Sequence, residues 1–208
     1  MPFRSLNRDI SMEDYSKNKL VVCIIYVIWA FFLFAGIWDL FQIPGRAIFW
    51  FAELAIAVFI YYKLKIPTII YLGILALFLA NLFGELFFGL FYIFPGFDKW
   101  LHVLSPLAAC TLFYFMFERK IKNKKILILL SAGLLLSFEL VWEIVEYFAD
   151  KNFQTLLAGV HSAGVEAYNS RLIIMPKYED TIYDMFYNLI GSVIWAIIAL
   201  FAIKKKKL

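Results

Sequence analysis

The chain has 208 residues, of which 63% are hydrophobic and 20% are aromatic, whereas only 17% are charged. This composition excludes an ordinary soluble domain, in which about 25% of residues are charged. The formal net charge of +4 and a lysine run confined to the last residues also argue against nucleic-acid binding. Both cysteines lie in or beside apolar runs, where we expect them to pack as small apolar side chains.

Apolar runs long enough to cross a bilayer follow one another along the chain. A membrane-spanning helix needs about 17–25 mostly apolar residues. We therefore predict one all-α domain over residues 1–208, a polytopic membrane helical bundle of about six transmembrane helices near 20–41, 47–62, 67–94, 101–117, 126–148 and 181–203. The third run is unusually long, and we expect a tilt or a kink at Gly84 or Gly89 there.

The distribution of Lys and Arg predicts how the bundle is oriented. Of the 20 basic residues, 15 fall in the two tails and in the loops at 63–66 and 118–125. Because basic residues in short loops mark the cytoplasmic side, we expect both termini to be cytoplasmic. Residues 1–19 and 204–208 are then cytoplasmic tails, and the long 149–179 segment is extracytoplasmic.

Acidic side chains recur at helical spacing in the last three apolar runs. Residues three or four apart share one face of a helix. Each of these helices is therefore predicted to present a stripe of ligand atoms at its outer end. The three stripes consist of Asp98 and His102, of Glu139, Glu143 and Glu146, and of Asp180, Asp184 and Asn188.

Carboxylates gathered at low dielectric cannot all stay ionised without a counter-charge. The basic residues expected nearby are Lys99, Arg46 and Arg171. A divalent ion would satisfy the charge, and a mixed oxygen and imidazole set suits Zn²⁺, Mn²⁺ or Mg²⁺. We predict a metal site with ligands from Asp98, His102, Glu143, Glu146, Asp180, Asp184 and Asn188.

Solvation by water is an equally good interpretation of the acids nearest the helix ends, which are Asp98, Glu146, Asp150 and Glu179.

The segments FDKWLH, WEIVEY and EDTIYDMFYNLIGS resemble motifs of the YjdF-like family of small integral membrane proteins. A more distant resemblance is to VanZ-like proteins, which place Asp-Lys-x-x-His before a helix. The family resemblance implies no settled activity. It implies site positions at Asp98, His102, Glu143, Glu146, Asp180, Asp184 and Gly191, whereas Glu139 rests on helical spacing alone. The segment with His161, Glu166 and Arg171 is longer than in the family pattern.

Two functions fit these residues. The first is a metal-dependent hydrolase or transferase of the cell membrane that acts on lipids or envelope precursors, with membrane lipid and a lipid-linked substrate as partners. Its catalytic residues would be Glu139, Glu143, Asp184 and His102. The alternative is a cation or proton transporter that uses the same carboxylates. Transport requires polar groups that continue toward the cytoplasm, where the sequence offers only Thr111, Ser131 and Ser192.

Overall fold

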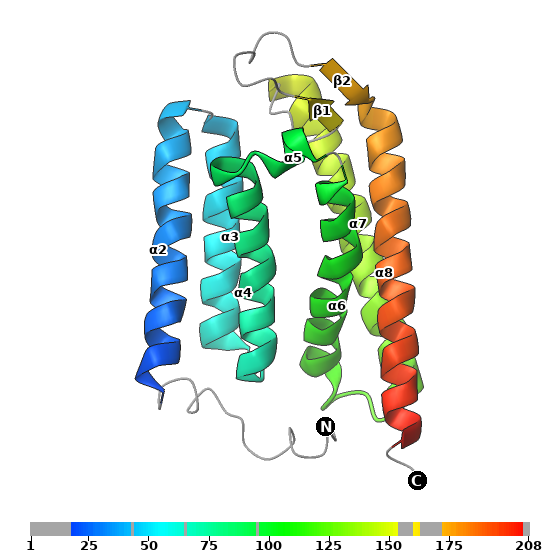
Figure 1. Cartoon of the computed structure of the whole chain (residues 1–208). Helices are drawn as coiled ribbons and strands as arrows, with labels where there is room; N and C mark the ends of the chain where they lie inside the picture. The colour runs from blue at the N-terminus through cyan, green and yellow to red at the C-terminus, as the bar shows by residue number, and fades with distance from the viewer. Residues whose placement is uncertain are drawn as a thin grey trace.

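The structure is a computed structural model that describes residues 18–42, 44–64, 66–94, 96–153, 160–162 and 172–205. Long helices run side by side, and the start of the first and the end of the last lie at the same end of the bundle (Figure 1). The helices and strands, in chain order, are α2 (Lys19–Gln42), α3 (Pro44–Lys63), α4 (Thr68–Leu82), the π-helix η1 (Phe83–Phe87), α5 (Leu90–Ile93), α6 (Phe97–Phe117), α7 (Lys124–Phe153), β1 (Val160–Ser162), β2 (Leu172–Met175) and α8 (Lys177–Lys205).

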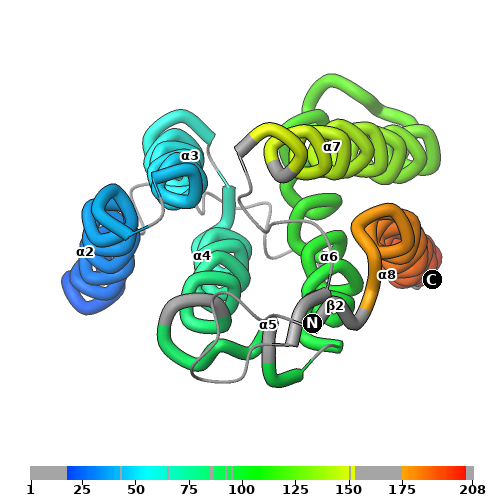
Figure 2. The backbone as a smooth tube through the Cα atoms, turned by 90° about the horizontal axis from the view of Figure 1, so that it is seen from above, coloured from blue at the N-terminus to red at the C-terminus, as the bar shows by residue number. Residues whose placement is uncertain are grey.

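The six longest described helices form two groups of three. Seen from above, α2, α3 and α4 lie on one side, and α6, α7 and α8 lie on the other (Figure 2). The first group buries a core that includes Phe32, Trp50 and Tyr71, and the second buries one that includes Cys110 and Trp195. Partly buried residues of α6 pack against the first core, so α4 and α6 join the two groups.

Local sequence explains where several helices begin. The side-chain oxygen of Asn18 accepts hydrogen bonds from the backbone N–H groups of the first turn of α2, and Asn123 does the same for α7. Such caps satisfy backbone donors that have no partner within the helix. Pro44 occupies the first position of α3, where a missing N–H costs nothing.

The third predicted span, 67–94, is not one continuous helix. The helix α4 ends at Leu82, and the chain continues through one π-helical turn and a break into the short α5. Gly89 adopts a left-handed conformation with φ of 57°, which favours glycine and cannot continue an α-helix. The expectation of a kink at a glycine in this run is therefore confirmed, but the irregular stretch is longer than one kink.

The prediction of an all-α membrane bundle is confirmed for the described residues, apart from one short antiparallel strand pair. Five described helices are long and apolar enough to cross a membrane, and α4 is a shorter apolar helix of 15 residues. Many of their large apolar side chains face outward, such as Phe41 and Leu129, which are 82% and 72% exposed. Outward apolar side chains fit lipid rather than water as the surrounding solvent. Orientation relative to the two sides of the membrane stays a prediction.

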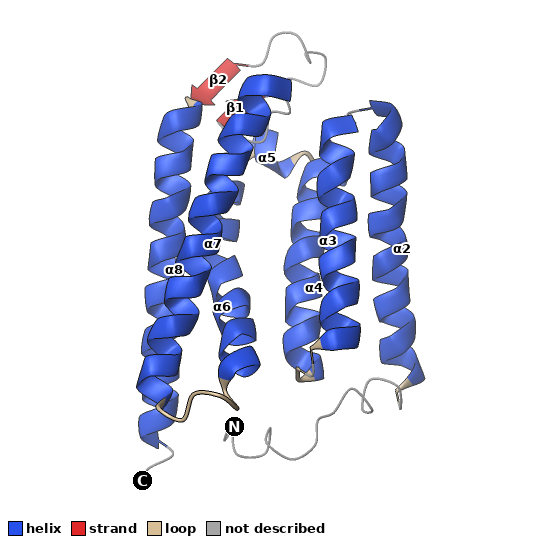
Figure 3. Cartoon of the chain, turned by 180° about the vertical axis from the view of Figure 1, so that it is seen from behind, coloured by secondary structure: helices blue, strands red, loops and turns tan. Residues whose placement is uncertain are grey.

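The segment 149–179, whose place outside the membrane stays a prediction, begins within α7 and ends within α8. The helix α7 continues to Phe153 and α8 begins at Lys177, and the two strands β1 and β2 pair between them. Figure 3 shows this pair at the end of the bundle opposite the point where α8 ends. The prediction for Glu166 and Arg171, and for the tails at 1–17 and 206–208, lies outside the described residues.

Candidate functional site

The candidate site lies where α6 and α8 begin, with the second half of α7 packed against both helices. Asp98 and His102 occupy the first two turns of α6. Asp180, Asp184 and Asn188 occupy successive turns of α8, and all three are buried. Their four-residue spacing therefore turns each set toward the bundle interior, as the sequence predicts.

Lys99 lies at the centre of an aspartate cluster. Its Nζ donates hydrogen bonds to Asp98 Oδ2 at 3.0 Å, to Asp184 Oδ1 at 2.5 Å and to Asp180 Oδ1. An ammonium has three N–H donors, so each donor has one carboxylate acceptor. Lys99 is only 8% exposed, and it draws the starts of α6 and α8 together through charge-assisted hydrogen bonds.

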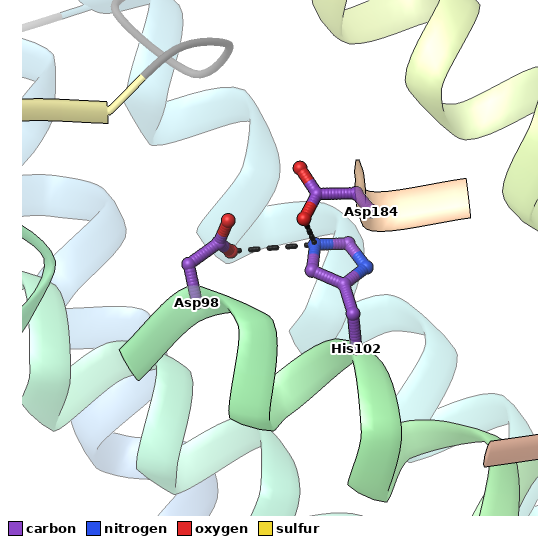
Figure 4. A group of neighbouring side chains, drawn as sticks. All are labelled: Asp98, His102 and Asp184. Carbon is purple, nitrogen blue, oxygen red and sulfur yellow. Dashed lines mark ion pairs between the residues drawn. The ribbon is translucent and has the colours of Figure 1, made fainter. Parts of the chain in front are cut away.

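His102 connects this aspartate cluster to the glutamates of α7. Its Nε2 lies 3.3 Å from Asp98 Oδ1 and 3.6 Å from Asp184 Oδ1, and both carboxylates point at that nitrogen (Figure 4). Its other nitrogen, Nδ1, lies 3.9 Å from Glu143 Oε1 and 3.0 Å from the Asn188 amide nitrogen. One imidazole therefore has acidic groups on both of its edges.

The Asn188 amide bridges His102 and α7. Its Nδ2 donates to Glu139 Oε2 at 3.1 Å and lies within hydrogen-bonding distance of His102 Nδ1. If that N–H points to Nδ1, then Nδ1 is the acceptor and Nε2 carries the ring proton. This tautomer donates toward Asp98 and directs the single Nδ1 lone pair at the Asn188 amide, so a cation bound at Nδ1 would replace that hydrogen bond.

Two groups of side chains could each surround a metal ion. The first is Asp98, His102 and Asp184, and the second is His102, Glu139 and Glu143, with ligand atoms within 4.8 Å of one another in each group. In the first group, Asp98 and Asp184 already bond the Lys99 ammonium. Among the described residues, no Lys or Arg pairs with the glutamates of the second group.

The second group also contains buried polar atoms without a partner. Glu143 is 1% exposed and Asn188 is fully buried. Glu143 Oε1 and Asn188 Oδ1 have no hydrogen-bond partner among the described residues. Leaving a buried acceptor unsatisfied costs about 1–3 kcal/mol, and more for a charged group. These two atoms therefore mark the place where a bound cation or proton would be most stabilising.

Close packing of α8 against α6 sets the geometry of the site. Pro106 lies inside α6, and Gly191 of α8 packs against it. A Cβ at Gly191 would lie 2.9 Å from the Pro106 Cγ and would overlap the Val103 carbonyl oxygen. Small residues allow membrane helices to approach this closely. Gly191 therefore acts through packing rather than as a ligand, one turn from Asn188.

Most of the predicted site residues lie together. Asp98, His102, Glu139, Glu143, Asp180, Asp184 and Asn188 form one continuous cluster. Glu146 belongs to neither group of candidate ligands and is half-buried. The side chains of Glu85 and Asp150, which the sequence places at similar depth, lie outside what the structure describes.

The importance of Lys99 was missed from the sequence. It was counted as one of several nearby cations, whereas it bonds three of the predicted metal ligands. The Asp-Lys pair at residues 98–99 is the signal that could have pointed to it.

Comparison with known proteins shows which family the chain comes from. Residues 20–205 match the model of a family described as "Predicted membrane protein (DUF2238)". The chain belongs to this family. No curated protein and no solved structure matches it.

Membership of the DUF2238 family agrees with the apolar helices in making this a multi-pass membrane protein. The predicted YjdF-like resemblance fits the match, which includes every residue of the site cluster. The DUF2238 match does not extend to VanZ-like proteins, so that likeness stays a prediction.

Proposed function

We propose that this chain is a cell-membrane protein that binds one divalent cation between Glu139, Glu143 and His102 and uses it in hydrolysis or group transfer on a lipid or envelope precursor. The observation that carries the proposal is the buried Glu143 Oε1, which has no hydrogen-bond partner in the part of the chain that the structure describes and faces His102 Nδ1 at 3.9 Å. A buried carboxylate oxygen without a partner is costly, and a cation beside it removes that cost.

The spacing of these atoms supports a metal of the size of Zn²⁺ or Mn²⁺. Ligand atoms about 2.0–2.1 Å from a tetrahedral zinc ion lie about 3.3 Å from one another. The 3.9 Å between His102 Nδ1 and Glu143 Oε1 needs only a small inward movement to reach this value. Two carboxylates and one imidazole match the ligand types of catalytic zinc sites, which keep one position open.

The surroundings of His102 support its role as a ligand. Its Nε2 lies 3.3 Å from Asp98 Oδ1, so this carboxylate would accept the ring proton and orient Nδ1 toward the glutamates, while Asp184 lies 3.6 Å away. Metal-binding histidines usually donate their second N–H to a carboxylate in this manner, which fixes the ring and raises its basicity. Asp98 and Asp184 are then positioning residues in this proposal rather than ligands.

The chemistry of such a site is metal-assisted attack by water. A bound divalent ion lowers the pKa of a coordinated water and polarises a substrate oxygen. Glu139 is partly exposed, and the Asn188 amide that bonds its Oε2 would orient this carboxylate as one of the three ligands. The site lies toward the end of the bundle where α7 ends and α8 begins, which is where a lipid head group would approach.

The test is metal content and its dependence on Glu143. We expect the purified protein, loaded with Zn²⁺ or Mn²⁺ and desalted, to retain one ion per chain, and Glu143→Gln to lose affinity by more than about tenfold. Glu118→Gln is the matched control, because Glu118 pairs with Lys124 at the opposite end of the bundle. A wild-type protein that retains no metal and whose melting temperature does not change when chelator is added would contradict the proposal.

The reaction requires a second measurement. We expect loaded protein, incubated with extracted polar lipids, to release a head group or acyl product that mass spectrometry detects. Chelation and Glu143→Gln should each abolish the release, and Glu118→Gln should not. Metal binding without any product would retain the cation site and reject the enzymatic step.

Cation or proton transport is the second candidate, and one observation favours it. Ser192, one turn beyond Asn188 on α8, is 1% exposed, and its hydroxyl oxygen has no hydrogen-bond partner among the described residues. This hydroxyl extends the polar groups from the site toward the end where α8 finishes. Vesicles containing the protein should then show a cation or proton flux that Ser192→Ala reduces, whereas the hydrolase proposal expects no flux.

A further inference from the structure

The ammonium of Lys99 occupies a position built like a metal site. It lies among Asp98, Asp180 and Asp184, three carboxylates contributed by two helices, and it donates one hydrogen bond to each. Asp180 is 3% and Asp184 is 2% exposed, and Lys99 itself is 8% exposed. A cation surrounded by two buried carboxylates and a third, partly exposed one is an arrangement that hard divalent ions adopt with oxygen ligands.

We propose that Lys99 is a built-in cation that fills a second, carboxylate-only metal position and thereby restricts the site to one exogenous ion. Removing the ammonium would open this position, which we call the aspartate position, to Mg²⁺ or Mn²⁺. The single ion expected in the wild-type chain rests on the proposed function, because that ion is the one between the glutamates and His102. The aspartate position itself does not rest on it.

The charge balance of the aspartate position supports this inference. Three aspartates around one ammonium have a negative net charge even after Lys99 is counted. Without Lys99, Asp98 and Asp184 would have no described Lys or Arg within ion-pair distance, and Asp180 would retain only its further partner. Carboxylates taken out of water must be paired, protonated or bound to a metal. Three aspartates carry a charge of −3, of which Lys99 balances one unit, and a divalent ion in its place would balance two.

Geometry separates this position from the glutamate side. His102 Nε2 faces Asp98 and Asp184, while its Nδ1 faces Glu143. The two cation positions therefore lie on opposite edges of one imidazole ring. In the wild-type chain the ammonium holds Asp98 in place as the acceptor for the Nε2 proton, so Lys99 is a positioning residue for His102.

The inference is tested by counting Mn²⁺ ions bound to the full-length protein in detergent, by metal analysis and by electron paramagnetic resonance. We expect Lys99→Met to bind one more ion than the wild type and to show spectral broadening from two neighbouring manganese ions. Lys99→Arg retains the positive charge and should bind the same number as the wild type. Adding Mn²⁺ should raise the melting temperature of Lys99→Met more than that of Lys99→Arg.

A second variant guards against misfolding. Lys99→Gln removes the positive charge, retains all three aspartates and keeps an amide that can donate hydrogen bonds to them. It should also bind one ion more than the wild type. If both variants fold and bind no additional ion, or if the wild type already binds two, the inference is wrong.

The outcomes for the two proposals are separable. A wild type without metal and a Lys99→Met variant with one ion would reject the proposed function and support the aspartate position. One ion in both proteins would support the proposed function and overturn the aspartate position.

Discussion

Replacing Gly191 by Ala should loosen the contact between α6 and α8 and disturb the site without touching any ligand. The added Cβ would lie 2.9 Å from the Pro106 Cγ and 3.1 Å from its Cβ, whereas ordinary contacts begin at 3.4 Å. The ring alone requires a shift of 0.3–0.5 Å by this comparison, and the Val103 carbonyl oxygen requires more. Neither a proline ring nor a backbone carbonyl can rotate away.

The expected cost follows from two opposing effects. Overpacking of this kind typically costs about 1–3 kcal/mol. Alanine is about 1 kcal/mol more favourable than glycine inside a helix, so part of that cost is offset. We therefore expect a net destabilisation of up to about 2 kcal/mol and a weaker affinity for metal, because Asn188 and Asp184 move with α8.

Gly133 provides the matched control on α7. A Cβ there would meet nothing within 4 Å, so Gly133→Ala should leave the melting temperature unchanged or raise it. Melting curves in detergent, recorded with and without Mn²⁺, compare the two variants. If Gly191→Ala melts at or above the wild type and retains its metal affinity, the packing argument is wrong.

Three further predictions concern other parts of the chain. Asp39→Asn should lower the melting temperature by far more than Glu118→Gln, because Asp39 is fully buried and bonds Arg46, and breaking a buried ion pair costs about 3–5 kcal/mol. Cysteine at Ser162 should react with an impermeant maleimide on intact cells, and reaction only after permeabilisation would reverse the predicted orientation. Trp195→Phe should cost about 0.6 kcal/mol, measured by unfolding, because it removes a 2.8 Å hydrogen bond; an equal effect in a background lacking the Thr111 hydroxyl would refute this.

The helices could be predicted from the sequence because their signal is local. A run of apolar residues of sufficient length identifies a membrane helix without knowledge of its neighbours. The break after Leu82 was less predictable, since Gly84 and Gly89 mark a weak point but do not fix how the backbone turns there. The β1–β2 pair was not predicted, because three or four residues carry too little periodic signal.

The site residues could be predicted in part because helical spacing reveals which side chains share a face. Spacing does not reveal how each helix is rotated relative to its neighbours. It also does not reveal which residues of a stripe lie beyond the region where the helices meet. Glu146 shares a stripe with Glu143, yet it lies about 4.5 Å further along α7 and belongs to neither ligand group. The partners of a stripe come from tertiary packing, which a single helix cannot specify.

Lys99 illustrates a different limit of periodicity. It follows Asp98 directly, so an ideal helix turns it about 100° away from the stripe of Asp98 and His102. Its four-carbon stem is long enough to bring the ammonium back to the aspartates. Periodic patterns describe where Cβ atoms point, and a long flexible side chain can place its charge on a neighbouring face.

The buried acids of this protein differ in whether the chain supplies their counter-charge. Asp39 has Arg46 and the Trp50 N–H, and the aspartates of the site have Lys99, so ion pairing and hydrogen bonding account for both. If the acids had only a structural role, Glu143 would also need an ion pair or hydrogen bonds for both of its oxygens. One of its oxygens has no described partner, and the imidazole beside it is neutral in the proposed tautomer. Because Glu143 is as deeply buried as the paired acids, its charge must be balanced by a proton, on Glu143 itself or on His102, or by an ion outside the chain. If the counter-charge is a proton, the stability of the protein should depend on pH and should not change with chelator. If it is an ion, the stability should fall when chelator is added. Glu143→Gln should abolish whichever dependence is found.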